Sequence, residues 1–142
     1  EGHLIEDTKI RTQMMEKRMR KFHSLKSEIS PPQQYGPESA EIILIGWGST
    51  RGAICEAVDI LNKEGVSVNS LHLTELWPFP AEALANVLND SRRSYVIENN
   101  ATGQLSHLIK AETGRTVSKK ILKYDGRPFT PAYIVQELRK ET

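Results

Sequence analysis

The chain has 142 residues, a length that suits one domain, and its 38% hydrophobic and 26% charged residues are typical of a globular protein. Its net charge of +1 predicts no general attraction to nucleic acid or anionic lipid, and no apolar run approaches the roughly 20 residues that a membrane-spanning helix needs. The single cysteine, Cys55, excludes an internal disulfide and a CxxC metal or iron–sulfur motif, and it is compatible with a cytoplasmic location.

Residues 1–28 predict a basic helical arm. Acidic residues and a capping Asp7 or Thr8 suit its start, and an apolar face follows helical spacing at Met15, Met19, Phe22 and Leu25. From residue 8 to residue 27 there are seven Lys or Arg against one acid, Glu16, a local balance of +6. This charge run indicates either a solvated helix or a docking surface for an acidic partner. The abrupt start, without Met or a signal pattern, predicts a piece of a longer chain or a mature product.

Residues 29–39 contain three prolines and a glycine, a composition typical of a linker without regular structure. The compact domain is therefore expected to span residues 40–142.

Strand and helix patterns alternate from residue 40 onward. Strands are expected at 41–45, 66–73, 94–97 and 120–123, and helices after Gly52, from Pro80, from Leu105 to near Gly114, and from Pro131. This alternation predicts an α/β fold with three layers: an open, mainly parallel sheet with helices on both faces, connected by right-handed crossovers.

A glycine-rich turn joins the first predicted strand to its helix, and it includes Gly46, Gly48, Ser49 and Thr50. Its spacing is GxGxxxG, which differs from the dinucleotide fingerprint GxGxxG. The turn therefore indicates either tight packing on the sheet or the binding of a phosphate-bearing ligand at a helix N-terminus.

The equivalent turn after the 94–97 strand is polar, and its candidate ligand or interface residues are Glu98, Asn99, Asn100, Thr102, Gly103 and Gln104. Asn100 or Thr102 is expected to cap the next helix. Because ligands of open α/β sheets bind at the carboxyl ends of strands, the same loop is also a candidate binding site.

The run from Leu76 to Pro80 holds two aromatic residues between prolines. Trp77 and Phe79 either plug the end of the core or face a partner subunit, where aromatic side chains are favoured anchors. The four histidines (His3, His23, His72, His107) do not share metal-ligand spacing, and no nucleophile motif is present, so no catalytic or metal-binding residue is proposed.

Four runs in order resemble the α subunit of 2-oxoacid:ferredoxin oxidoreductases. They are residues 45–50 with 52–54, 71–73 with 76–80, 96–105 and 123–130, and the opening Gly2-His3 with Glu6-Asp7 resembles the segment that joins that subunit's thiamine-binding-type domain to its C-terminal domain. The motif set is most similar to the branch that acts on 2-oxoglutarate.

The resemblance implies the fold of the transketolase C-terminal domain, with five strands of which one is antiparallel. It implies that the parent enzyme oxidatively decarboxylates a 2-oxoacid with coenzyme A and reduces ferredoxin. Thiamine diphosphate, magnesium and the iron–sulfur cluster would lie outside this domain, which would hold no cofactor and would assemble with the β subunit and the other α-subunit domains. The isolated chain is expected to be inactive.

Two alternatives stay open at the level of sequence. One is a free-standing module that binds a nucleotide or phosphate in the glycine turn, and the other is the matching domain of a different thiamine enzyme. The two loops at residues 46–50 and 98–104 are expected to lie at one edge of the sheet, where both would approach the phosphates of coenzyme A.

Overall fold

The computed structural model describes residues 4–89 and 93–140, so Gly2 and His3 lie outside the described residues. The chain divides into two compact units, residues 1–30 and residues 31–142.

The first unit contains one helix, α1, which runs from Thr8 to Lys26. The Asp7 carboxylate caps it by accepting a hydrogen bond from the Ile10 N–H at 2.9 Å, as one of the two predicted caps. No residue of α1 is buried. None of the described helices is both long enough and apolar enough to cross a membrane.

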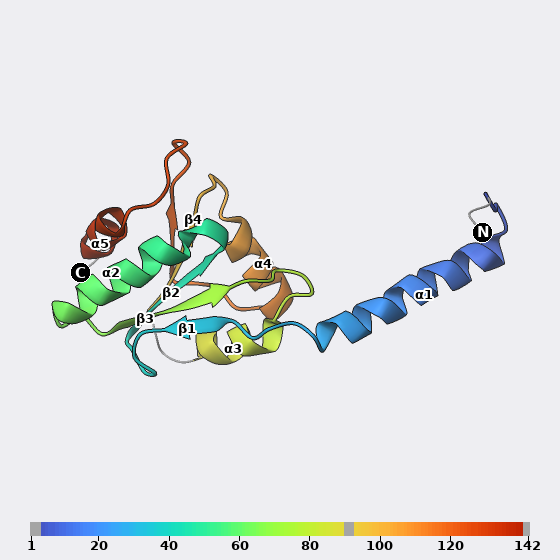
Figure 1. Cartoon of the computed structure of the whole chain (residues 1–142), viewed down its shortest axis with the longest axis horizontal. Coiled ribbons are helices and arrows are strands. Elements are labelled where there is room, and N and C mark those ends of the chain that lie inside the picture. The colour runs from blue at the N-terminus through green and yellow to red at the C-terminus, as the bar shows by residue number, and fades with distance from the viewer. Residues whose placement is uncertain (1–3, 90–92, 141–142) are drawn as a thin grey trace. The chain divides into compact units, whose positions relative to one another are not determined.

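The second unit is built on a five-stranded sheet with the order β1-β3-β2-β4-β5 (Figure 1). The strands are Gln33–Tyr35 (β1), Ile42–Trp47 (β2), Val68–Leu73 (β3), Arg93–Glu98 (β4) and Lys119–Leu122 (β5). β2 through β5 pair in parallel and only β1 is antiparallel, so the predicted mainly parallel sheet with one antiparallel strand is confirmed.

The predicted linker needs one correction. Residues 33–35, within the stretch expected to lack structure, form the edge strand β1 and pair with β3 from Gln33↔His72 to Tyr35↔Ser70. The compact unit therefore begins at Pro31, before the expected start at Ala40. The prolines lie on either side of the strand, where they end it without removing a hydrogen-bond donor from its interior.

Helices cover both faces of the sheet (Figure 1). Arg51–Lys63 (α2) and Pro131–Arg139 (α5) pack on one face with a core that includes Leu44, Val58, Ile97 and Ile134. Ala81–Asn89 (α3) and Gln104–Thr113 (α4) lie on the other face. Because strand residues alternate between the two cores, β2 is buried along almost its whole length, as expected for a central parallel strand.

Candidate functional site

The turn after β2 is shaped by close approach of α2 to the sheet. A Cβ atom at Gly46 would lie 2.3 Å from Cδ1 of Ile54 and 2.8 Å from Oγ1 of Thr50, so the absence of a side chain lets α2 sit against the strand end. Two residues later Gly48 has a φ of 59°, a left-handed conformation that favours glycine, and opens the short 3-10 turn Gly48–Thr50.

The N-terminus of α2 has no side-chain cap. Neither the 3-10 turn nor α2 receives a capping hydrogen bond from its N-cap side chain, and the Thr50 hydroxyl donates instead to the Trp47 carbonyl at 2.9 Å. Backbone N–H groups at such a terminus, together with the helix dipole, attract anions.

The N-terminus of α4 is filled from within the protein. The Glu98 side chain is fully buried, and its two oxygens accept from the N–H groups of Leu105 (2.8 Å) and Ser106 (3.3 Å). The Ser106 hydroxyl and the Asn100 amide also donate to it, at 3.4 Å and 2.8 Å. An internal carboxylate thus takes the place of an external anion at this helix.

Asn100 completes the cap of α4. Its Oδ1 accepts from the N–H groups of Thr102 (3.1 Å), Gly103 (2.6 Å) and Gln104 (3.3 Å). Of the two predicted caps, Asn100 and Thr102, the structure therefore has Asn100. The sequence reasoning missed that Glu98 is the deeper part of this cap, because Glu98 ends β4, well before the first residue of α4, Gln104.

Two adjoining cavities lie at the edge of the sheet where the carboxyl ends of β2, β4 and β5 meet. One, of about 230 Å³, is lined by Trp47, Gly48, Ser49, Thr50, Asn99, Asn100 and Gln104. The other, of about 410 Å³, is lined by Ser49, Asn99, Lys123, Tyr124, Gly126, Arg127 and Pro128. Ser49 and Asn99 belong to both cavities, so the two predicted loops do meet at one place.

A third loop, residues 123–130, connects β5 to α5 (Figure 1). It supplies the positive charge of the larger cavity. The Lys123 ammonium, with only 10% of its side chain exposed, pairs with Asp125, donates to the Arg127 carbonyl at 3.1 Å and lies 5.7 Å from the Tyr133 ring centroid. The hydrogen bond from Lys123 lowers the pKa of Asp125. Since Asp125 balances Lys123, Arg127 provides the net charge.

The sequence singled out this third loop for its resemblance and, more weakly, for the aromatic Phe129 beside Pro128, but not as part of a binding site. Its position was nevertheless inferable, because β5 lies beside β4 in a parallel sheet and the loops after both strands must emerge at the same edge.

The predicted site residues fall into two groups. Gly48, Ser49, Thr50, Asn99, Asn100 and Gln104 line a cavity. The other four residues shape the protein itself. Gly46 leaves room for the Ile54 side chain, Glu98 is buried, and Thr102 and Gly103 donate hydrogen bonds from their backbone N–H groups to Asn100. Burial of Glu98 corrects its prediction as a residue that touches a ligand or an interface.

The two aromatic residues expected at a partner surface are in different environments. Phe79 is 5% exposed and packs in the core beneath α3 and α4, so its prediction as a surface residue is wrong. Trp77 is 59% exposed. The run from Leu76 to Pro80 thus combines both alternatives: Phe79 fills the core, and Trp77, on the other side of Pro78, is exposed to solvent.

Residues 40–134 match the family described as pyruvate:ferredoxin oxidoreductase core domain II. The chain is 39% identical over 132 residues to the α subunit of 2-oxoacid:ferredoxin oxidoreductase 1 from Aeropyrum pernix, covering 89% of this chain and 21% of that protein. The chain therefore spans about a fifth of the length of this curated relative.

Solved structures agree with this relationship. A 2-oxoglutarate:ferredoxin oxidoreductase from Magnetococcus marinus, with 2-oxoglutarate, coenzyme A and succinyl-CoA bound, matches 99% of this chain and 24% of its own at a TM-score of 0.83 and 32% identity. A transketolase from Pichia stipitis matches 78% of this chain and 18% of its own at a TM-score of 0.60 and 17% identity, which shows the shared fold alone. The chain belongs to the pyruvate:ferredoxin oxidoreductase core domain II family, as found in the α subunits of 2-oxoacid:ferredoxin oxidoreductases.

Proposed function

We propose that this chain acts as an assembly domain in the α subunit of a 2-oxoacid:ferredoxin oxidoreductase whose substrate is 2-oxoglutarate. The observation that carries the proposal is the match of 99% of the chain, at a TM-score of 0.83, to an enzyme described as a 2-oxoglutarate:ferredoxin oxidoreductase. The parent enzyme would convert a 2-oxoacid to its acyl-CoA and reduce ferredoxin in the cytoplasm.

Other parts of the parent enzyme would hold thiamine diphosphate, magnesium and the iron–sulfur cluster. This chain would contribute surface for the β subunit and for the remaining α-subunit domains, and the isolated chain would be inactive. Exposed Trp77 is a candidate anchor in such a contact, since aromatic residues concentrate binding energy at interfaces.

Reconstitution tests the assembly role and the substrate together. The chain would be produced with the β subunit and the remaining α-subunit regions from the same genome, and viologen reduction would be measured with 2-oxoglutarate or pyruvate. We expect a complex on size exclusion and a higher kcat/KM for 2-oxoglutarate. Preference for pyruvate would overturn the substrate assignment alone, whereas failure to form a complex would overturn the assembly role.

The cavities at the carboxyl edge favour a contact with the phosphates of coenzyme A. Of the N-termini of α2 and α4, which both border the smaller cavity, that of α4 is occupied by Glu98 and Asn100, whereas that of α2 lacks a side-chain cap. Ser49 joins that terminus to the cavity that holds Arg127, so a phosphate beside Ser49 would meet both N–H groups and a guanidinium.

This contact is tested in the assembled enzyme with Ser49→Ala and Arg127→Gln. Each is expected to raise the KM for coenzyme A, Arg127→Gln by about tenfold, the equivalent of roughly 1.4 kcal/mol for a lost charged hydrogen bond. Arg115→Gln is the matched control, because Arg115 is exposed and precedes β5 at the opposite edge of the sheet. An unchanged KM in both site variants would leave these loops a scaffold role only.

The same geometry supports one alternative function, a free-standing phosphate-binding module. Both cavities and the α2 N-terminus lie within a single compact unit, so they require no other chain to form. A rise in the melting temperature of the isolated chain with nucleotide would favour this module.

A further inference from the structure

Helix α1 carries an apolar stripe that its own unit does not cover. The stripe consists of five side chains: Ile10, Met14, Met15, Met19 and Leu25. At about 100° per residue these positions fall within one half of the helix circumference. Each is 40–55% exposed, and no residue of α1 is buried.

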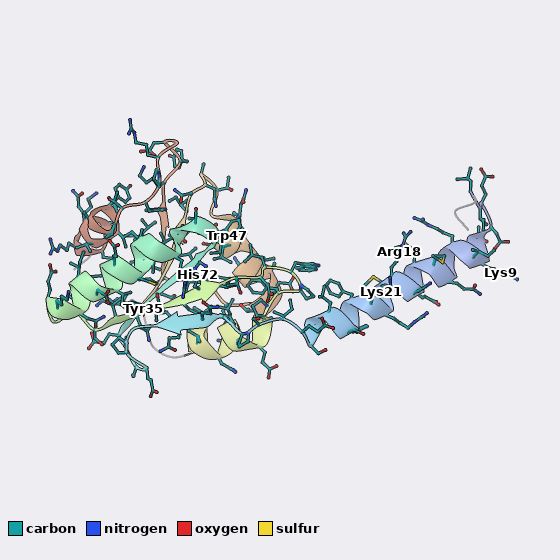
Figure 2. The ribbon with its side chains drawn as sticks, in the orientation of Figure 1. Lys9, Arg18, Lys21, Tyr35, Trp47 and His72 are labelled. Atoms are coloured by element: carbon teal, nitrogen blue, oxygen red, sulfur yellow. The ribbon has the colours of Figure 1, made fainter. Side chains whose placement is uncertain are left out.

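Cations are interspersed with the stripe. Arg18, one of three basic residues labelled along α1 in Figure 2, places its guanidinium 3.8 Å from the Met15 sulfur. The helix carries seven Lys or Arg and one acid, Glu16, a net charge of +6. A complementary surface must therefore be apolar and bordered by carboxylates.

This chemistry disfavours two other occupants. Two copies of α1 packed together would bring two helices of charge +6 into contact, which is electrostatically unfavourable. A lipid surface suits helices with cations on one face and apolar residues on the other, whereas here Arg11 and Arg18 lie in the same half of the circumference as the methionines.

A longer relative contains a counterpart of α1. Because the Magnetococcus structure matches 99% of this chain, essentially all of α1 is included in the match, and this match occupies 24% of that protein. The family match begins only at residue 40, so α1 lies before the domain and accompanies it in longer α subunits.

We propose that α1 docks through its apolar stripe onto a surface in a part of the α subunit outside these 142 residues. That surface is apolar and bordered by carboxylates. This inference rests on the proposed assembly function. The flexible thioethers of the three methionines adapt to an irregular groove, and the surrounding cations set the orientation of the helix and add attraction that salt weakens.

Titration calorimetry tests the docking with two double variants of the full chain. Met15→Glu with Met19→Glu alters the stripe, and Gln13→Glu with Ser24→Glu, on the opposite half of the helix, makes the same charge change. The titrant is the complex of the remaining α-subunit regions with the β subunit. We expect the stripe variant to raise the Kd at least about tenfold and the control to change it less than about threefold, with binding weaker at 500 mM than at 50 mM NaCl.

The outcomes separate the docking from the assembly function. Equal, undiminished binding of both variants would overturn the docking and leave assembly intact, and equal weakening would show that charge alone acts and would also overturn it. Absence of binding by the unaltered chain would overturn both. If light scattering shows that the unaltered chain is a dimer and that the stripe variant is a monomer, the stripe binds a second copy of the chain, and the proposed docking is overturned.

Discussion

Glu98 joins strand, loop and helix through one side chain. It ends β4, lies fully buried, and receives hydrogen bonds from Asn100, Leu105 and Ser106. Every partner is a donor, so the site requires a group that accepts at both oxygens. Replacement by an amide would place an NH₂ group opposite an N–H group in a buried position.

Glu98→Gln is therefore expected to lower the free energy of unfolding by about 1–3 kcal/mol, the cost of a buried donor without an acceptor. Urea unfolding at 25 °C measures this change. Glu112→Gln makes the same chemical change at an exposed position of α4 and is expected to shift stability by less than about 0.5 kcal/mol. Equal unfolding midpoints for the two variants would contradict the capping role.

Gly46 and Gly52 offer a second comparison of single residues. A Cβ at Gly46 would meet the buried Ile54 side chain at 2.3 Å, whereas a Cβ at Gly52 would meet no atom within 4 Å. Gly46→Ala is expected to destabilise by about 1–3 kcal/mol through overpacking. Gly52→Ala, in the first turn of α2, is expected to stabilise by up to about 0.5 kcal/mol. Shifts of melting temperature in the same direction would refute the packing explanation.

Strand β1 protects the edge of the sheet at the level of elements. It pairs with β3, and its Tyr35 hydroxyl donates to both carboxylate oxygens of Asp59 on α2 at 3.0 Å. This hydrogen bond raises the pKa of Tyr35. A three-residue strand is thus attached both to its neighbour in the sheet and to the helix above it.

Two truncations test this role. Residues 31–142 retain β1 and are expected to match the unfolding free energy of the full chain within about 0.5 kcal/mol, because no residue of α1 is buried. Residues 37–142 lack β1 and are expected to lose about 2 kcal/mol or more and to self-associate through the bare β3 edge. Calorimetry and light scattering measure both effects. Equal stability of the two truncations would show that β1 is dispensable.

The sequence predicted regular elements where apolar spacing was long enough to show a period. The spacing predicted α1, the four parallel strands and the helices that follow them, and the predicted ends of these elements lie within a few residues of the observed ends. It missed β1 because a three-residue strand among prolines has no period to detect, and because its partner β3 comes more than 30 residues later.

At the scale of the whole molecule, the position of the candidate site could be predicted from the sequence. Which of its residues line a cavity and which are buried or cap a helix could not. Parallel strands bring their carboxyl-end loops to one edge, which the alternating pattern implied. Glu98, the last residue of β4, is buried, whereas the next residue, Asn99, lines a cavity, and composition alone does not specify which of two adjacent polar side chains points inward. Phe79 and Trp77 also differ in burial, and aromatic composition does not specify which side chain faces the core.

The contact of α5 with α2 has a consequence for synthesis on the ribosome. α2, β2 and β3 are synthesised before α5, but the apolar core on their helical face also needs Ile134, Val135 and Leu138 from α5. A nascent chain therefore exposes this face until α5 has been made. Chaperones that shield apolar surface would have their longest period of contact at α2, and release would coincide with the arrival of α5.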